Sequence, residues 1–465
     1  RVQNMSSSEN RNRRDPCSGA SAFLNGKLVF CHQTGSLVLS LFDGLFLEVF
    51  LNTEAQNMEA QNMEQGAERI LPVGSRADWP LKPGITFLNH GSFGSCPLPV
   101  LAYQQEMRDR LEKQPVQFFV RDLERLWDDA LSCLAQFLGT QFDQLTFVPN
   151  ATHGVNAVLR SLDLEAGDEL LVTDHEYNAC RNALDFVAGR AGAKVVVAAL
   201  KIPVQQPSDW VAALLEKITP RTKLLLIDHV TSPTGIVLPM EKIIDEMKAR
   251  GIRVLVDGAH APGMIPLNLD ALGADFYTGN CHKWLCAPKG AGFLFVRKEL
   301  QKNIRPLAIS HGANATRKDR SRFHLEFGWT GTADPSACLS VPVAIDWMSN
   351  QMPGGWSAIM KRNKELVLSA RTMLSAQLGW NLLAPDSMIG SMAAIEMPDS
   401  TEPAPLTTPL YSDPYQDNLW DAHQVEVPIV PWPAPPRRLI RISAQLYNHT
   451  ENYIRLINVL KASSQ

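Results

Sequence analysis

Seven short apolar runs between residues 145 and 296 constrain the fold of this 465-residue chain more than any other feature. Each run is apolar without alternation, as in "ELLVT" and "RVLVD". Continuous apolar character indicates strands that are covered on both faces, which is typical of a mainly parallel sheet between helices. The runs that predict strands are 145–148, 169–173, 194–200, 223–230, 253–257, 275–279 and 292–296.

Helical patterns separate these runs. Residues 210–218 and 240–251 carry apolar side chains at helical spacing, and the second segment ends in basic residues and glycine, as a helix end does. The sequence therefore predicts an α/β fold, in which ligands bind beyond the carboxyl ends of the strands. A hydrophobic content of 45% in a chain of this length predicts one large core and a smaller second one.

Charge and cysteine usage narrow the partners and the compartment. A formal net charge of -4 offers no basic face, so we expect no nucleic-acid partner. The 8 cysteines are dispersed without a CxxC pair, which favours a cytoplasmic protein. The apolar segment 37–51 is interrupted by Asp43 and Glu48 and is shorter than the roughly 20 residues that span a bilayer. We therefore expect no membrane partner.

One acidic residue closes an otherwise apolar strand in "RVLVDGAHAPG". Asp257 needs a partner if it is buried, and a positively charged heterocyclic nitrogen would serve as well as an arginine. A helix cap or a salt bridge is the structural alternative. His260 follows three residues later and could reach the same ligand, or it could be an ordinary buried histidine.

Lys283 lies in an apolar setting, "GNCHKWLCAP", just past the next predicted strand. A desolvated lysine has a depressed pKa and becomes an amine nucleophile. It follows Asp257 by 283 - 257 = 26 residues, so adjacent parallel strands would bring the amine and the carboxylate to one cleft. An exposed surface lysine is the alternative.

Two further features fit an anionic ligand. In "PNATHGVNAVLRSL", Asn150 or Thr152 can cap a helix that starts near His153, and the free amides of a first helical turn bind phosphate. Near the end of the chain, Arg441 lies in the strand-like "RRLIRIS", where it could bind a carboxylate with two parallel hydrogen bonds or point to solvent from an edge strand.

Together these motifs resemble a known family. "FLNHGSFGSCP", "ATHGVNAVLRSL", "VDGAHAPG", "TGNCHKWLCAPKG" and "RISAQLYN" look like the class V aminotransferase family of fold type I pyridoxal phosphate enzymes, in the branch of isopenicillin N epimerase and plant cysteine desulfhydrases. The resemblance covers roughly residues 80–460. The resemblance does not cover residues 1–77, which differ in composition from the rest and which we expect to be a poorly structured extension. It implies a joining segment (78–99), a large cofactor domain (100–314) and a small α+β domain (315–465).

The resemblance also implies roles for individual residues. Lys283 would form the internal Schiff base with pyridoxal 5'-phosphate and shuttle the Cα proton, and Asp257 would keep the pyridine nitrogen protonated. His260 would contact the phenolic oxygen or the substrate. Arg441 would bind the substrate α-carboxylate. The residues that would hold the phosphate are Thr152, His153, Asn280 and His282.

The same resemblance implies a ring over the cofactor and a second subunit. Tyr177 is the first candidate for the stacking ring and His175 the second. Thr332, in "GWTGTADPSACLS", would reach the phosphate of a neighbouring subunit, which implies a homodimer with shared active sites. Asn89 and His90 would lie beside the substrate.

The reaction is the part that the sequence leaves open. Related cysteine desulfurases that form a persulfide use a nucleophilic cysteine in the loop before the carboxylate-binding arginine. Here the last cysteine, Cys338, lies about a hundred residues before Arg441, so persulfide transfer is disfavoured. A β-lyase acting on a cysteine-like amino acid needs only Lys283 as base and a proton for the leaving sulfur, so it is our preferred hypothesis. An epimerase, with Tyr177 or His90 as second acid, and an aminotransferase remain alternatives, as does a noncatalytic chain that keeps the fold.

Overall fold

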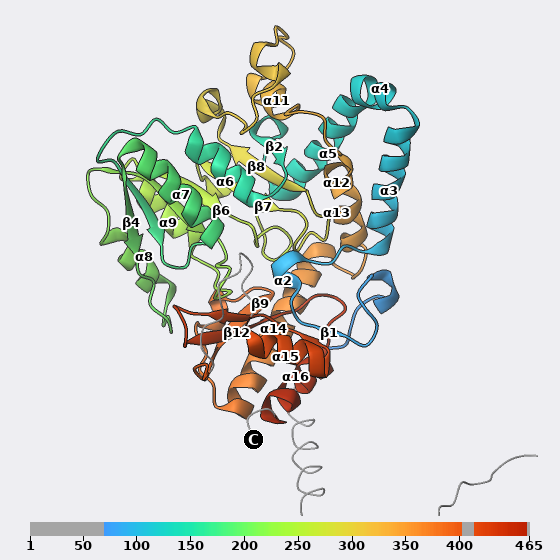
Figure 1. The fold of residues 1–465 in the computed structure, drawn as a ribbon, viewed down its shortest axis with the longest axis vertical. Helices are drawn as coiled ribbons and strands as arrows, with labels where there is room; N and C mark the ends of the chain where they lie inside the picture. The colour runs from blue at the N-terminus through green and yellow to red at the C-terminus, as the bar shows by residue number, and fades with distance from the viewer. Residues whose placement is uncertain (1–68, 402–412, 463–465) are drawn as a thin grey trace, which may run out of the picture. The chain divides into compact units, whose positions relative to one another are not determined.

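The largest sheet of the protein has seven strands, and the computed structural model describes residues 69–401 and 413–462. The strand order is β2-β8-β7-β6-β5-β3-β4, and neighbours are parallel from β7 to β4, whereas β8 runs antiparallel to β7 and β2. The strands are β2 (Leu145–Val148), β3 (Glu169–Thr173), β4 (Lys194–Ala198), β5 (Thr222–Asp228), β6 (Arg253–Asp257), β7 (Phe276–Asn280) and β8 (Gly292–Val296). The predicted α/β fold with a mainly parallel seven-stranded sheet is confirmed (Figure 1).

Alternate side chains of each strand enter different cores. In β5, Leu224 and Leu226 join one buried cluster, whereas Leu225 and Ile227 join the other. Helices α6 and α7 contribute to the first cluster, and α5, α8 and α9 contribute to the second. Both faces of the sheet are therefore covered, which explains why its strands are apolar without alternation.

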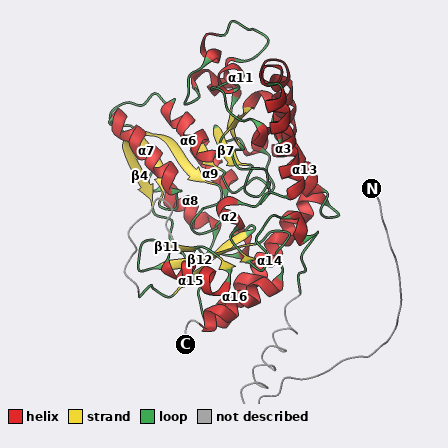
Figure 2. Ribbon diagram, turned by 45° about the vertical axis from the view of Figure 1, so that its right-hand side comes forward, coloured by secondary structure: helices red, strands yellow, loops and turns green. Residues whose placement is uncertain are grey.

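Helices surround this sheet and continue after it (Figure 2). Those before or between the strands of the large sheet are α2 (His90–Phe93), α3 (Leu98–Lys113), α4 (Pro115–Gln117), α5 (Leu123–Leu138), α6 (Ala151–Arg160), α7 (Asn178–Ala191), α8 (Pro207–Leu215), α9 (Met240–Lys248) and α10 (Leu269–Leu272). Those after it are α11 (Arg322–Phe327), α12 (Ser336–Leu339), α13 (Val341–Ser349), α14 (Gly355–Leu378), α15 (Pro414–His423) and α16 (Thr450–Ala462).

Two small sheets are built mainly from the last part of the described chain, and one of them also contains the first strand. β12 (Arg438–Ser443) is the central, antiparallel strand between β9 (Met392–Met397) and β11 (Ile429–Pro431), and β1 (Thr86–Phe87) pairs with β10 (Val425–Glu426). Helix α14 packs on β9 and β12, and α16 packs on α14.

The organised chain begins earlier than the sequence suggested. Residues 1–68 lie outside the described residues, but Arg69 pairs with Glu451 at 2.6 Å. The backbone N–H of Val73 donates to the carbonyl of Leu446 at 2.9 Å. The expectation of a poorly structured segment up to residue 77 therefore does not hold for residues 69–77, because their partners lie about 370 residues further along and left no local pattern.

Helix α6 starts where an anion site was expected. Asn150 caps it by accepting the backbone N–H of His153 at 2.9 Å, so the helix begins at Ala151 and not near His153. A side chain at Gly154 would overlap Thr278 of β7. The glycine therefore lets the first turn of α6 lie directly against the sheet.

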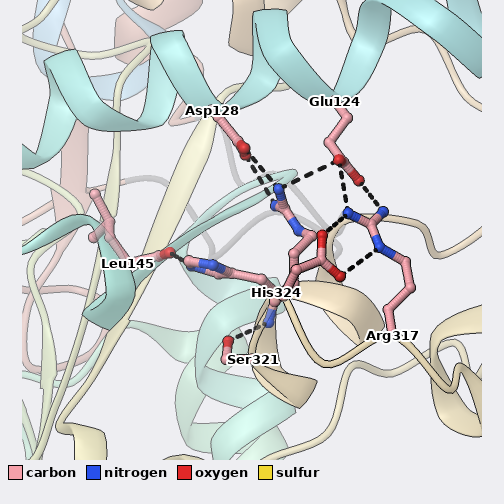
Figure 3. Close-up of polar contacts among 8 residues, drawn as sticks. Glu124, Asp128, Leu145, Arg317, Ser321 and His324 are labelled. Atoms are coloured by element: carbon pink, nitrogen blue, oxygen red, sulfur yellow. Dashed lines mark hydrogen bonds and ion pairs between the residues drawn. The ribbon is translucent and has the colours of Figure 1, made fainter.

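A surface ion-pair cluster, which comprises Glu124, Asp128, Arg317, Asp319 and Arg320, fastens the loop before α11 to α5 (Figure 3). Arg317 donates to Glu124 at 2.6 Å and to Asp319 at 2.5 Å, and Arg320 donates to both carboxylate oxygens of Asp128 at 2.6 and 2.9 Å.

Within residues 69–401 and 413–462, no helix has the length and apolar character needed to cross a membrane.

Candidate active site

Lys283 lies in the turn after β7, at the carboxyl edge of the large sheet, and its amine is buried. Burial, followed by the charge of Arg441, lowers the pKa of Lys283 to about 8, although Asp257 and Asp228 act in the opposite direction. Near neutral pH, the fraction of Lys283 that is unprotonated is therefore larger than that of a lysine exposed to water. The alternative of an exposed surface lysine is excluded.

His260 is the nearest polar partner of this amine. Its Nε2 lies 3.0 Å from Lys283 Nζ, and Trp284 Nε1 donates to its Nδ1 over 3.5 Å. Burial and the charge of Lys283 lower the pKa of His260 well below its ordinary value, so the ring is neutral. With Nδ1 accepting from Trp284, the proton of the ring sits on Nε2 and points at Nζ, an arrangement that favours the unprotonated lysine.

Asp257 ends β6 beside this pair, and its carboxylate is bonded on both oxygens. Cys180 Sγ donates to Oδ2 at 3.1 Å, and the backbone N–H of Ala259 donates to Oδ1 at 2.9 Å. Burial raises the pKa of Asp257, which these bonds and Lys283 partly oppose. Since Asp257 and Lys283 act electrostatically on each other, the structure brings the predicted acid and amine together.

Two more carboxylates converge there that sequence reasoning missed. Asp228 ends β5 and is the register partner of Asp257, so both side chains lie on the same face of the sheet. Glu176, just after β3, offers an oxygen within 4.8 Å of the Cys180 sulfur and of an Asp257 oxygen. Burial, then the neighbouring carboxylates, raises the pKa of Glu176 and of Asp228 well above their ordinary values.

The inner acid cluster, defined as Glu176, Asp228 and Asp257, is incompletely paired. Neither oxygen of Glu176 and only one of the two Asp228 oxygens has a hydrogen-bond partner among the described residues. Asp228 was detectable, because "KLLLID" ends in an acid just as "RVLVD" does. Glu176 follows its strand by three residues and carried no such signal.

Arg441 is buried in the central strand β12 and does not point to solvent. One terminal nitrogen donates to the backbone carbonyl of Ser232, and the other donates to Ser92 Oγ at 2.9 Å. Its Nε has no hydrogen-bond partner within the described segments. Burial lowers the pKa of Arg441 to about 10, and its charge acts on Lys283 and His260.

The two candidates for a stacking ring are placed differently. Tyr177 is 41% exposed, and its phenol lies in the fields of Asp257 and Arg441, so it faces the site. His175 is fully buried, with Nδ1 bonded to Thr234 Oγ1 at 2.9 Å and Nε2 to the Leu200 carbonyl at 2.8 Å. Because both nitrogens of His175 are engaged and its ring packs against two tryptophans, the geometry supports Tyr177 for this role.

The predicted phosphate residues gather around the first turn of α6. Asn280 Oδ1 accepts the backbone N–H of Ala151 at 2.9 Å, and Thr152 and His153 are half-buried in that turn. The His153 amide already donates to Asn150, so it is less available than expected. His282 Nδ1 is buried and has no hydrogen-bond partner in the described part of the chain.

The remaining predicted residues do not face the amine in this chain. Asn89 is bonded to Glu426 and accepts from Ser92, which in turn bonds Arg441. His90 is buried, with both ring nitrogens engaged by protein groups. Thr332 is exposed in the loop between α11 and α12.

An amine of depressed pKa, a buried acid on the adjacent strand and a buried arginine define a site of the kind found at the carboxyl edge of α/β enzymes. Residues 116–412 match the family described as Aminotransferase class-V. The chain belongs to this family, as the motifs indicated.

Related proteins match most of the chain, and a solved structure shares its fold. An isopenicillin N epimerase of Amycolatopsis lactamdurans is 35% identical over 412 residues, which cover 84% of this chain and 98% of that protein. A probable chloroplastic L-cysteine desulfhydrase of Arabidopsis thaliana is 29% identical over 80% of this chain and 82% of its own length. A solved structure of a C-DES variant, described with glycine linked to its PLP cofactor, has a TM-score of 0.70 at 22% identity and covers 83% of this chain and 99% of that chain.

Proposed function

We propose that the protein is a pyridoxal phosphate-dependent enzyme that acts at the Cα of an amino acid. The observation that carries this proposal is the buried amine of Lys283, 3.0 Å from His260 Nε2 and in the fields of both Asp257 and Arg441. A lysine whose pKa is lowered to about 8 can attack a carbonyl carbon and can later take up a proton, which are two tasks of one group.

The residues present fit the cofactor and its amino-acid substrate, because two buried polar atoms of the site need a partner that the protein does not supply. His282 Nδ1 and Arg441 Nε are such atoms among the described residues. Asp257 would hold the ring nitrogen, Lys283 the carbonyl carbon, and His282 with the first turn of α6 the phosphate. Bound pyridoxal phosphate supplies an electron-withdrawing ring that stabilises negative charge at the Cα of a linked amino acid.

The protein's own groups would then bind the substrate and move its proton. Arg441 orients the substrate through its carboxylate, and Ser92 and Ser232 hold the guanidinium at the required place. Lys283 Nζ takes the Cα proton, with the neutral His260 beside it. Tyr177 covers the site from its exposed side.

For the reaction, we favour β-elimination from a cysteine-like substrate, as in a desulfhydrase or C-S lyase. It requires a base, a carboxylate-binding group and a proton donor for the leaving sulfur, and no further residue. A persulfide-forming reaction is disfavoured because no cysteine follows Cys338, which is itself buried with its pKa raised to about 12.

Epimerisation is the second candidate, and two observations favour it. The relatives named isopenicillin N epimerase are 35% and 34% identical to this chain, against 29% for the desulfhydrase of Arabidopsis thaliana. Tyr177 provides a second acid group near the substrate position. An aminotransferase remains the third possibility and an inert fold homologue the fourth.

We also propose a homodimer in the cytoplasm. Thr332 is exposed, and its loop resembles the loop that, in the family, reaches the cofactor phosphate of the neighbouring subunit. Light scattering of the purified protein tests the dimer, and Thr332→Ala is expected to weaken cofactor retention only if the subunits share their sites.

Incubation with pyridoxal phosphate and a panel of amino acids, followed by product identification, tests the reaction. Pyruvate with a thiol would establish the lyase, a D-amino acid the epimerase, and a keto acid that needs a second substrate the aminotransferase. Lys283→Ala is expected to lower turnover by at least about 10³-fold, whereas Lys318→Ala, at an exposed position, should leave it unchanged. A protein that stays colourless with added cofactor would contradict the proposal.

A further inference from the structure

His90 is a fully buried imidazole whose two nitrogens reach two distant segments. Nδ1 lies 2.8 Å from the hydroxyl of Tyr447, and Nε2 lies 3.0 Å from the backbone carbonyl oxygen of Lys283. Burial lowers the pKa of His90 to about 3, so the ring is neutral and carries one proton. Tyr447 is buried too, and its pKa is raised well above the ordinary value, so it keeps its hydroxyl proton.

These contacts fix where each proton lies. A carbonyl oxygen only accepts hydrogen bonds, and its contact with Nε2 at 3.0 Å is shorter than that of the Gln445 amide nitrogen at 3.4 Å, so we place the ring proton of His90 on Nε2, donated to Lys283. Nδ1 is then an acceptor and takes the hydroxyl proton of Tyr447. The two bonds form one chain with a single direction, from Tyr447 through His90 to the backbone of Lys283.

The backbone of Lys283 is held closely from this side. Its carbonyl also accepts the backbone N–H of Cys286 at 3.1 Å, and Cys286 has a φ of 59°, a left-handed value that is uncommon outside glycine. Gly94, at the end of the same helix as His90, has a φ of 69°, and a Cβ there would overlap the carbonyl of His282. The segment from His90 to Gly94 therefore lies directly on the lysine turn.

We propose that His90, oriented by Tyr447, is a positioning residue for Lys283. The inference rests on the proposed function of Lys283 as the amine that binds the cofactor. In this role, His90 contacts neither the cofactor nor the substrate, because both of its ring nitrogens are engaged by the protein. It fixes the peptide from which the lysine side chain departs, so that Nζ stays beside His260. A group held in a reactive geometry gains rate because less freedom is lost in the reaction.

Reductive labelling of Lys283 tests this role without turnover. Apoprotein is mixed with pyridoxal phosphate and quenched with borohydride at set times, and labelled Lys283 is measured by peptide mass spectrometry. His90→Leu is expected to slow labelling by about 10-fold or more, as expected for lost orientation. His90→Gln keeps an N–H near the position of Nε2 and should restore most of the rate.

Tyr447→Phe tests the direction of the chain and is the smaller change if His90→Leu does not fold. Without the hydroxyl, Nδ1 loses the donor that orients the ring, so His90 holds the Lys283 carbonyl less firmly and labelling should again slow. His311→Leu, at an exposed position, is the matched control and should label as the wild type does.

Each outcome decides between the role and its alternatives. Labelling of His90→Leu at the wild-type rate overturns the inference, as does equal slowing of His90→Gln and His90→Leu at equal melting temperature, which would indicate packing alone. If the wild type itself is not labelled at Lys283, the proposed function fails instead. Slowing by His90→Leu and Tyr447→Phe, with rescue by His90→Gln, supports the positioning role.

Discussion

The surface ion-pair cluster (Figure 3) and the inner acid cluster both gather carboxylates, but they differ in how these are paired. On the surface, each carboxylate faces an arginine: Arg317 bonds Glu124 and Asp319, and Arg320 bonds Asp128. The side chain of Glu124 is 53% exposed and that of Asp128 30% exposed. Water and arginine together satisfy these groups, so they add little to stability individually.

The inner acid cluster is the opposite case. Glu176, Asp228 and Asp257 are at most 8% exposed, and three of their oxygens have no hydrogen-bond partner within residues 69–401 and 413–462. Incompletely satisfied polar groups in a folded protein are costly and concentrate at functional sites. The protein therefore completes its ion pairs where they fasten a loop and leaves carboxylates incompletely paired beside the reactive lysine.

Replacing one aspartate in each cluster by its amide should separate the two most strongly. Asp257→Asn removes the anion that we propose for the ring nitrogen and is expected to lower kcat/KM by about 10²- to 10³-fold. Asp128→Asn has the same shape change on the surface and should leave kcat/KM unchanged. Steady-state kinetics with saturating cofactor measure both. Equal kcat/KM values for Asp257→Asn and Asp128→Asn would contradict the functional role of the inner acid cluster.

Arg441→Leu tests the buried arginine against the paired surface ones. Loss of the carboxylate bonds should raise KM by about 10- to 100-fold, since bonds to charged groups contribute about 1.5–3 kcal/mol. The charge of Arg441 also disfavours the protonated lysine, so its removal should raise the pKa of Lys283 above about 8. The pH dependence of reductive labelling then shifts to higher pH. An unshifted midpoint would show that Arg441 does not act on the amine.

Glu176→Gln tests whether an incompletely paired carboxylate of the inner acid cluster lowers the free energy of unfolding. The folded-state pKa of Glu176 is raised above its unfolded value, so at higher pH the unfolded chain binds fewer protons than the folded one. This group therefore costs stability as pH rises above about 4.5, its ordinary pKa. The variant should gain about 1 kcal/mol at pH 8, because an uncharged side chain replaces an unpaired acid, and converge with the wild type near pH 4. Urea unfolding at both pH values measures this. A destabilised variant at pH 8 would contradict it.

Glu124→Gln should have the smallest effect. The exposed pair with Arg317 is expected to contribute less than about 1 kcal/mol, and less still at high salt, where surface charges are screened. Urea unfolding at low and at 1 M salt provides the measurement. A loss of stability of Glu124→Gln well above about 1 kcal/mol, and equal at both salt concentrations, would contradict this prediction.

The sequence predicted the sheet well because its strands, apart from the edge strand β4, are largely buried on both faces. All seven strand positions follow from continuous apolar runs, and the amine and acid at the ends of β7 and β6 follow from the same rule. Arg441 was found by its residue type and its strand context. These are local signals, and the burial that explains them is visible in a single segment.

Contacts between distant segments could not be predicted in this way. Nothing in "NHGSFGS" shows that His90 bonds Tyr447, which lies 357 residues later. His175 and Tyr177 are two residues apart, yet one packs between tryptophans while the other faces the site. Side-chain direction in a loop depends on its neighbours in space, which the order of residues does not reveal.

The bonds of Arg441 to Ser92 and Ser232 join segments that the ribosome synthesises far apart in time. Ser92 emerges 349 residues before the arginine it will hold, and Ser232 emerges 209 residues before it. The strands that carry Asp257 and Lys283 are complete by Val296. The lysine and its acid are therefore synthesised well before the arginine, and the group that we propose for the substrate carboxylate is the last of the three to leave the ribosome.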